Sequence, residues 1–468
     1  MWYNTRVISG ENNAVGRLLA RVRPVLEAVE RAGGRALVVG GAVRDAVLGL
    51  DPHDVDVEVY GLEAQPLAAA LAPLGRVEAV GRSFGVLKLF LPGGAVDVAL
   101  PQRRSRNPSG ERGHIAAPDP TMTYEEAAAR RDFTWNAMAI TPAGELLDPY
   151  GGQRDLAGRI IRHATPLFGE DPLRVLRAVQ FAARFDMRLA PETAALCRSL
   201  LPEAAGLPPE RVWGEWQKWA LKGQAPAAGL RALEESGWLA LYPELAALRG
   251  CPQPSAYHPE GDVWTHTGLV CDCAAAIATR ESLPDEQRVA LLFAALCHDL
   301  GKPETTATGP DGEPHSPGHA SAGVPLTERL LERIGAPRRV AQLVVPLVRE
   351  HMAHLGSQVT ARAVRRLAVR LQPATVALWD LLVEADCSGR PPLPPCRPGA
   401  PFAELAARLG VLERRPEPIV RGQHLIAAGH APGPELGELL RKAYQAQVDG
   451  AFDTLEGGLE WLRRHREE

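Results

Sequence analysis

The stretch Val39-Gly40-Gly41-Ala42-Val43-Arg44-Asp45, followed by Asp54-Val55-Asp56, decides the fold of the N-terminal part of the chain. The short apolar run over residues 36–39 predicts a strand, and residues 42–48 predict a helix. A strand that ends in Gly-Gly before a helix lets backbone N–H groups approach a phosphate closely. We therefore expect a phosphate-binding turn at Gly40 and Gly41.

Residues 54–59 alternate strictly, with Asp54, Asp56 and Glu58 on one face of a predicted strand and valines on the other. Alternation places the carboxylates of Asp54 and Asp56 about 7 Å apart. This spacing suits one or two Mg²⁺ ions, which also hold substrate phosphates and stabilise an in-line displacement. A lone Asp-x-Asp is more often a solvated acidic face, but the preceding Gly-Gly-x-x-Arg-Asp favours the catalytic interpretation.

The flanking sequence predicts a mixed α/β block. Apolar spacing over residues 14–32 indicates a helix, and residues 86–91 and 95–100 indicate two strands joined at Pro92-Gly93-Gly94. Asp97 lies in the second of these strands. It is either a third catalytic carboxylate beside the Asp-x-Asp pair or a residue that supports the pair.

Composition and charge exclude several classes of protein. The 468 residues exceed one compact core, and 46% apolar with 23% charged residues fits a soluble globular protein. No apolar run approaches the ~18 residues of a membrane span, and the polar N-terminus lacks a signal peptide's apolar core, so we expect a cytoplasmic protein without a membrane partner. The net charge of −4 excludes a basic molecule overall but allows a local basic groove. The seven scattered cysteines are expected to be mostly buried, reduced thiols.

Four motifs in consecutive order resemble those of the bacterial tRNA nucleotidyltransferase and poly(A) polymerase superfamily. They are the glycine turn with Asp-x-Asp quoted above, Arg130-Arg131-Asp132-Phe133-Thr134-Trp135-Asn136-Ala137, Asp148-Pro149-Tyr150-Gly151-Gly152, and Glu170-Asp171-Pro172-Leu173-Arg174-Val175-Leu176-Arg177. The resemblance implies an α+β fold, with a polymerase-β-like nucleotidyltransferase head of mixed sheet and helices followed by helical domains.

The resemblance also implies roles for individual residues. The implied nucleotide-binding residues are Gly40, Gly41, Arg44, Arg130, Arg131, Asp132, Asn136, Asp171, Arg174 and Arg177. In the family, the aspartate and first arginine of the last motif act as a protein template for the incoming base. Helical spacing would place Asp171, Arg174 and Arg177 within about 120° of one helix face. A carboxylate and an arginine fork can pair with the amine and ring nitrogen that C and A share. The alternative is an ordinary Asp–Arg surface pair.

The basic stretch Arg103-Arg104-Ser105-Arg106-Asn107-Pro108-Ser109-Gly110 predicts a mobile loop. The family's flexible loop, which helps to switch specificity from C to A, occupies this interval and is shortened in enzymes that add only CC. Here the interval is not shortened, which favours full CCA addition or terminal A addition.

A second constellation surrounds His298-Asp299-Leu300-Gly301-Lys302, which ends an apolar helical run. Adjacent His-Asp with a remote His and Asp resembles the HD metal-dependent phosphohydrolase domain, which implies a metal site of His266, His298, Asp299 and Asp386. His319 and His351 either allow a second metal or are ordinary polar residues. Imidazole and carboxylate ligands suit Mn, Ni, Fe or Mg.

Five segments are expected along the chain. They are an N-terminal helical extension (1–32), the nucleotidyltransferase head (33–150), a helical neck and body that binds the nucleotide base and RNA (151–250), an HD domain (251–390), and a linker with a helical C-terminal tail (391–468). Six prolines between residues 390 and 401 mark the linker.

Head followed by HD domain resembles the multifunctional CCA-adding proteins of bacteria. This implies template-independent addition of C, C and A to tRNA 3′ ends from CTP and ATP, with Mg²⁺ at Asp54 and Asp56 and release of pyrophosphate. Alternatives are an enzyme that adds only A, or a poly(A) polymerase. An alternative of another class is an HD phosphohydrolase with an RNA-binding head.

Overall fold

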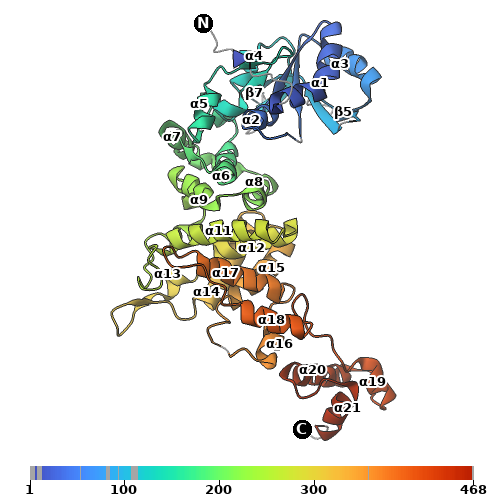
Figure 1. Ribbon diagram of the computed structural model, residues 1–468, viewed down its shortest axis with the longest axis vertical. Coiled ribbons are helices and arrows are strands. Elements are labelled where there is room, and N and C mark those ends of the chain that lie inside the picture. The colour runs from blue at the N-terminus through green and yellow to red at the C-terminus, as the bar shows by residue number, and fades with distance from the viewer. Residues whose placement is uncertain are drawn as a thin grey trace. The chain divides into compact units, whose positions relative to one another are not determined.

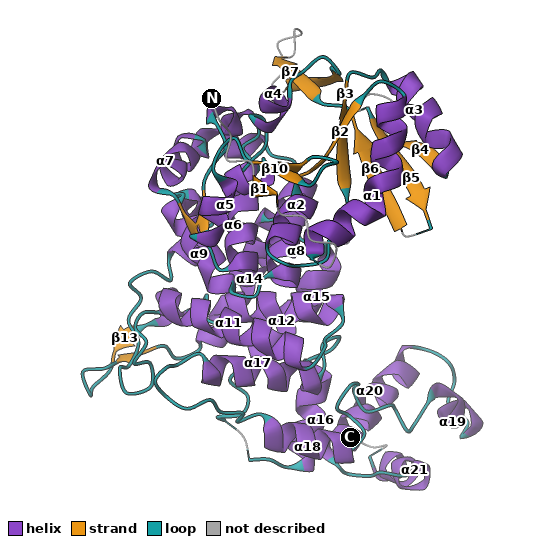
Figure 2. Ribbon diagram, turned by 45° about the horizontal axis from the view of Figure 1, so that its top comes forward, coloured by secondary structure: helices purple, strands orange, loops and turns teal. Residues whose placement is uncertain are grey.

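The structure is a computed structural model that describes residues 6–7, 13–52, 54–80, 85–92, 94–106, 114–356 and 358–465. These residues fall into two compact units. The first comprises Met1–Ala178, Met187–Leu207 and Glu235–Gly237, and the second comprises Val179–Asp186, Pro208–Glu234 and Trp238–Glu468. Most strands belong to the first unit, whereas the second is almost entirely helical (Figures 1 and 2).

An eight-stranded mixed sheet forms the centre of the first unit. Its order is β1 (Arg6–Val7), β10 (Glu145–Leu147), β9 (Ala139–Ile140), β2 (Arg35–Val39), β3 (Asp56–Tyr60), β6 (Gly94–Ala99), β5 (Val86–Leu91) and β4 (Arg76–Val80). Neighbouring strands are antiparallel except β3 and β6, which run parallel. Parallel pairing makes Asp56 and Asp97 direct register partners, so both side chains lie on one face of the sheet.

The helices of the first unit are α1 (Ala14–Arg31), α2 (Gly41–Val47), α3 (Ala64–Leu71), α4 (Tyr124–Ala128), α5 (Gly152–Ala157) and α7 (Pro191–Ser199). Helices α1 and α2 pack against β2 of the sheet. The side chain of Asn13 caps α1, which buries Leu18 and Val22 and packs against β2 and α3 (Figure 1). One face of β3 carries Asp56, Glu58 and Tyr60. Tyr60 lies in an apolar cluster with Met122.

Several predicted elements are confirmed and others are corrected. The strand over 86–91 is β5, and α6 (Arg174–Phe185) connects the two units along the chain. The predicted strand over 54–59 begins later, at Asp56, and Asp54 lies in the preceding bend. Pairing nevertheless reaches Val55, whose carbonyl accepts a hydrogen bond from the Asp97 amide at 2.9 Å.

The predicted loop over 103–110 is wrong for its first half. Residues 102–106 form β7 (Gln102–Arg106), which pairs antiparallel with β8 (His114–Pro118). The rest of that predicted loop, residues 107–110, lies outside the described residues. Short strands that the sequence did not signal also occur, in the pairs β11 (Ile160–Ile161) with β12 (Arg188–Leu189) and β13 (Ala307–Thr308) with β14 (Pro314–His315).

The second unit is a set of packed helices, as the sequence predicted. They are α8 (Pro209–Lys222), α9 (Pro226–Glu235), α10 (Pro243–Ala246), α11 (Val263–Arg280), α12 (Asp285–Cys297), α13 (Lys302–Thr305), α14 (His319–Arg333), α15 (Arg338–Glu350), α16 (Ala361–Arg370), α17 (Val376–Ser388), α18 (Ala400–Arg408), α19 (Gly422–Ala427), α20 (Pro434–Asp449) and α21 (Leu455–Arg464). α12 is the central helix and contacts α8, α11, α15 and α17. Its Phe293 stacks on Trp213 with ring centroids 5.4 Å apart. No described helix combines the length and apolarity of a membrane span.

Two features fasten the C-terminal helices. Arg362 and Arg366 of α16 pair with Asp449 of α20 at 3.2 and 2.6 Å. Cys387, at the end of α17, forms a disulfide with Cys396, which corrects the expectation of reduced thiols at these two positions. The spacing of cysteines along a sequence does not reveal which pairs approach within disulfide reach.

Candidate active sites

Three carboxylates predicted as catalytic residues gather on the two central strands β3 and β6 and just before β3. Asp56 begins β3, its register partner Asp97 lies on β6, and Asp54 precedes the strand. Burial raises the pKa of Asp56, Arg131 opposes that shift, and the negative charges of Asp97 and Asp54 add to it. Lys88 offsets part of the charge, since its Nζ lies 3.7 Å from Asp97 Oδ1. A divalent cation would relieve the remaining repulsion.

The glycine turn lies beside these carboxylates. Gly40 has a φ of 72°, which favours glycine because side chains with a Cβ rarely adopt it. A Cβ built on Gly40 would lie 3.5 Å from both Asp56 Oδ2 and Arg131 Nη1. The turn therefore brings the backbone close to the carboxylate and to one predicted nucleotide-binding arginine.

The first motif is joined to the second through Arg44. Its guanidinium is buried, donates from Nη1 to Asn136 Oδ1 at 3.0 Å, and lies 5.6 Å from the ring centroid of Trp135. Its Nε donates to Asp45 Oδ1 at 2.7 Å. Two predicted site residues, separated by 92 positions along the chain, thus hold each other in place.

The second motif is joined to the last by two further ion pairs. Arg130 Nη1 lies 2.8 and 3.0 Å from the two carboxylate oxygens of Glu170. Asp132 Oδ2 accepts from Arg177 Nε at 2.8 Å, and its Oδ1 accepts from Asn136 Nδ2 at 2.9 Å. Burial alone would raise the pKa of Asp132, but Arg177 outweighs it and the pKa falls below the ordinary aspartate value.

The predicted base template is placed differently from the helical expectation. Asp171 lies before α6 in an extended conformation, with φ −139° and ψ 98°, so helical spacing does not relate it to Arg174. The reason is Pro172, because the residue before a proline disfavours helical geometry. Arg174 donates to the carbonyls of Leu167, at 2.9 Å, and Arg130.

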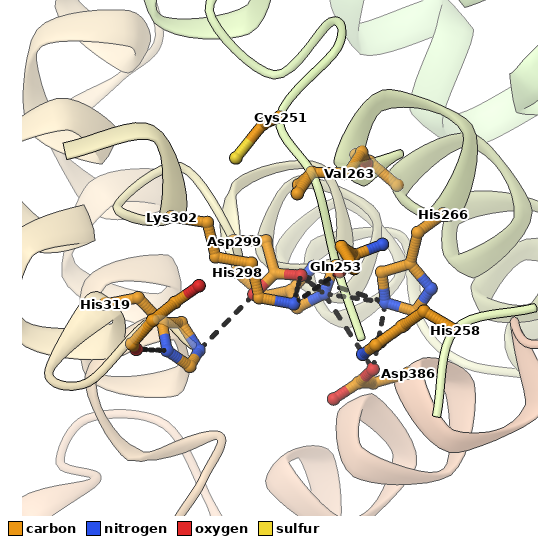
Figure 3. A network of polar contacts seen from close by, with 12 residues as sticks. Cys251, Gln253, His258, Val263, His266, His298, Asp299, Lys302, His319 and Asp386 are labelled. Atoms are coloured by element: carbon orange, nitrogen blue, oxygen red, sulfur yellow. Dashed lines mark hydrogen bonds and ion pairs between the residues drawn. The ribbon is translucent and has the colours of Figure 1, made fainter. Parts of the chain in front are cut away.

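The predicted HD residues converge in the second unit (Figure 3). They come from five helices or the residues just after them: His266 in α11, His298 and Asp299 after α12, His319 in α14, His351 after α15, and Asp386 in α17. The Nε2 atoms of His266 and His298 are 3.4 Å apart, and those of His319 and His351 are 3.1 Å apart. All four imidazoles are buried.

Three of these imidazoles have their other nitrogen on a backbone carbonyl. The pairs are His298 Nδ1 with Ala295 at 2.8 Å, His319 Nδ1 with Ser316 at 2.8 Å, and His351 Nδ1 with Val348 at 2.7 Å. A histidine that donates from Nδ1 to an acceptor presents Nε2 to a metal ion. The ring orientation therefore suits metal ligation.

Asp299 lies between the two histidine pairs. Its Oδ2 is 3.1 Å from His298 Nε2 and 2.7 Å from Lys302 Nζ, while its Oδ1 is 3.4 Å from His319 Nε2. Burial opposes the charge of Asp299, but His298 and Lys302 outweigh it and hold its pKa far below the ordinary range. This donor set fits one or two divalent cations that share Asp299.

Sequence reasoning gave no role to Glu260, which supports the same site. Its Oε1 lies 2.8 Å from His266 Nδ1 and 2.9 Å from His258 Nδ1. His266 Nε2 faces Asp386 Oδ1 at 3.1 Å. Burial opposes protonation of His266, but Asp386 and Glu260 raise its pKa to about 9. A metal ion would displace that proton.

Comparisons with known proteins identify the families of both parts of the chain. Family models match a poly A polymerase head domain at residues 36–162, a probable RNA- and SrmB-binding site of polymerase A at 186–248, and an HD domain at 263–379. Fold and sites thus define a nucleotidyltransferase head joined to an HD domain.

Two similar proteins identify the family to which the chain belongs. The multifunctional CCA protein of Xanthomonas campestris pv. campestris is 39% identical, and the match covers 88% of this chain and 97% of that protein. The protein of the same name from Xylella fastidiosa is 42% identical over 76% of this chain and 84% of its own. The chain belongs to the multifunctional CCA protein family.

Solved structures share the fold. The Bacillus stearothermophilus CCA-adding enzyme in complex with CTP has a TM-score of 0.64 and 23% identity, over 98% of each chain. The Thermotoga maritima CCA-adding enzyme complexed with tRNA has a TM-score of 0.59 and 21% identity, over 99% of each chain.

Removing the two central HD ligands should abolish metal retention. The double substitution His298→Ala and Asp299→Ala deletes the shared carboxylate and one imidazole, so we expect bound transition metal to fall to background. Elemental analysis of the dialysed protein measures this. His315→Ala is the control, because His315 lies in the exposed β14 and pairs with Asp311. Equal metal content in the double variant and the wild type would contradict the assignment.

Proposed function

We propose that this protein adds C, C and A to the 3′ end of tRNA from CTP and ATP and releases pyrophosphate. The observation that carries the proposal is the register pairing of Asp56 with Asp97 beside the Gly40 turn. A cytoplasmic location is proposed with this activity, because the proposed substrate is tRNA.

The proposed reaction is an in-line displacement. The tRNA 3′-hydroxyl oxygen attacks the α-phosphorus, and the bond to pyrophosphate breaks. Mg²⁺ bound by Asp54 and Asp56 would supply the positive charge that this exchange of oxygens requires. Asp97 adds negative charge to the same cation site.

Arg130, Arg131, Asp132 and Asn136 are proposed to bind the ribose and triphosphate of the incoming nucleotide. Ion pairs with Glu170, Glu58 and Arg177 hold these side chains, which reduces the ordering cost when nucleotide binds. Gly40, Gly41 and Arg44 complete the nucleotide site.

Base selection is proposed to reside in Asp171 and Arg174, with Arg177 alongside. The backbone contacts of Arg174 fix its guanidinium near the second motif. Addition of A alone and poly(A) synthesis use the same motifs, and tRNAs that end before CC, after CC or after CCA distinguish these alternatives when incubated with labelled CTP or ATP.

The carboxylate pair should be essential for transfer. Asp54→Ala or Asp56→Ala should reduce nucleotide addition to background while tRNA binding stays nearly intact, because the metal site is lost and the RNA-binding surface is not. Labelled-nucleotide incorporation and a tRNA gel-shift measure the two properties. Glu78→Gln, on the edge strand β4 of the same sheet, is the control. Wild-type turnover in either alanine variant would refute the proposal.

Arg174→Ala should weaken discrimination against GTP and UTP more than it weakens triphosphate affinity. Loss of a bidentate base contact costs about 1–3 kcal/mol of selectivity. The measurement compares kcat/KM for all four nucleotides on tRNA ending before CC. An unchanged preference would assign Arg174 to holding the Leu167 and Arg130 carbonyls only.

A second activity, metal-dependent phosphohydrolysis, is proposed for the HD site. The convergent Nε2 atoms and the shared Asp299 favour it, with Mn, Ni, Fe or Mg as the cation. The His298→Ala, Asp299→Ala variant should lose hydrolysis of a chromogenic phosphodiester or phosphomonoester and retain nucleotide addition. Hydrolysis at the wild-type rate would place that activity elsewhere.

A further inference from the structure

The acidic face of β3 continues beyond Asp56 into Glu58 and Tyr60, which have no part in the proposed reaction. Both are buried, with 8% and 7% of their surface exposed. The register partner of Glu58 is Leu37, and Tyr60 packs in the same apolar cluster as Leu37. A buried carboxylate is costly unless it is paired, so the partners of Glu58 reveal what holds it there.

Each oxygen of Glu58 has one partner. Tyr60 donates its hydroxyl to Oε2 at 2.6 Å, and Arg131 Nη2 lies 3.2 Å from Oε1. The phenol is a neutral donor, and burial followed by the charge of Glu58 raises its pKa. Tyr60 therefore fixes the carboxylate, and the carboxylate fixes one side of the guanidinium.

The other terminal nitrogen of Arg131 lies near the carboxylate of Asp56. Its Nη1 and Asp56 Oδ2 both lie 3.5 Å from the same point, the position a Cβ would take on Gly40. Within the described part of the chain, Arg131 forms an ion pair of 4.0 Å or less with Glu58 and none with Asp56. The guanidinium is thus next to the metal-binding carboxylate without being bound to it.

This separation matters because arginine and a divalent cation compete for the same oxygens. A guanidinium that closed on Asp56 would form a strong charge-assisted pair and occupy lone pairs that a cation needs. It would also withdraw Arg131 from the nucleotide. Glu58 offers the guanidinium a second, equally charged partner on the same strand face, two residues away.

We propose that Glu58, oriented by Tyr60, is a positioning residue for nucleotidyl transfer, which holds Arg131 beside Asp56 and keeps that carboxylate available to a divalent cation–nucleoside triphosphate complex. The inference rests on the proposed nucleotidyltransferase function of the head.

Glu58→Gln keeps the shape and removes the charge. The Mg²⁺ concentration for half-maximal CTP binding should rise about 10–100-fold, the usual effect of losing a partner that orients a metal site. Tyr60→Phe, which removes only the hydroxyl, should shift it in the same direction by less. Calorimetric CTP binding against Mg²⁺ concentration measures this without turnover, and nucleotide addition is measured in parallel.

Adding Arg131→Gln to Glu58→Gln separates positioning from a merely structural role. With the competing guanidinium gone, the Mg²⁺ requirement should return toward the wild-type value even though CTP binds more weakly. Glu78→Gln is the matched control, since Glu78 pairs with Arg76 at 3.3 Å on the exposed strand β4 and should change neither quantity.

Two results would overturn the inference: a Mg²⁺ requirement in Glu58→Gln and Tyr60→Phe equal to that of Glu78→Gln, or no recovery in the double variant. If Glu58→Gln does not fold, Tyr60→Phe decides, because it leaves the charge in place. A wild-type protein that binds CTP with Mg²⁺ but adds no nucleotide would refute the proposed function and leave the binding test of Glu58 standing.

Discussion

The close approach of several carboxylates is the electrostatic constraint on which the nucleotidyltransferase head depends. The parallel pairing of β3 with β6 sets Asp56 opposite Asp97, and Asp54 and Glu58 add charge on either side. Such a cluster persists in a folded protein only if cations oppose it. Lys88 and Arg131 neutralise part of the negative charge. The negative charge that remains favours binding of a divalent cation beside Asp56.

The HD site also brings metal-ligating side chains close together, but most of them are histidines. Histidines surround Asp299, and three of them are anchored through Nδ1 to the carbonyl of the residue three positions earlier. The orientation of each ring is therefore decided locally, by the residue three positions earlier. Convergence of the rings is decided by the packing of α11, α15 and α17 around α12, with α14 packed against α15.

The fold was predictable where local signals were strong. The apolar run before the turn at Pro92-Gly93-Gly94 gave the bounds of β5, whereas strict alternation over residues 54–59 placed the start of β3 too early. The two- and three-residue strands β9 and β10 were missed, because so few residues show no period. Asp171 was misplaced because helical spacing was extended across Pro172. The motifs grouped the predicted site residues along the chain, but pairs such as Arg44–Asn136 and Asp132–Arg177 join positions far apart in sequence, which periodicity cannot reveal. The Glu58–Arg131 contact was invisible for the same reason, whereas Glu260 is close in sequence to His258 and His266 and was assigned no role.

The Cys387–Cys396 link closes a ring with a sequence separation of 9, and four of the residues inside it are prolines. A ring this short restricts the unfolded chain by less than about 3 kcal/mol, and the prolines have already removed part of that freedom. Beside it, Arg397 donates to Asp380 at 3.0 and 2.7 Å and anchors the same segment to α17. Two interactions therefore hold this segment: the disulfide and the ion pair between Arg397 and Asp380. Reduction of the disulfide would leave the contact between Arg397 and Asp380 in place, so the segment would keep one of its two attachments to α17.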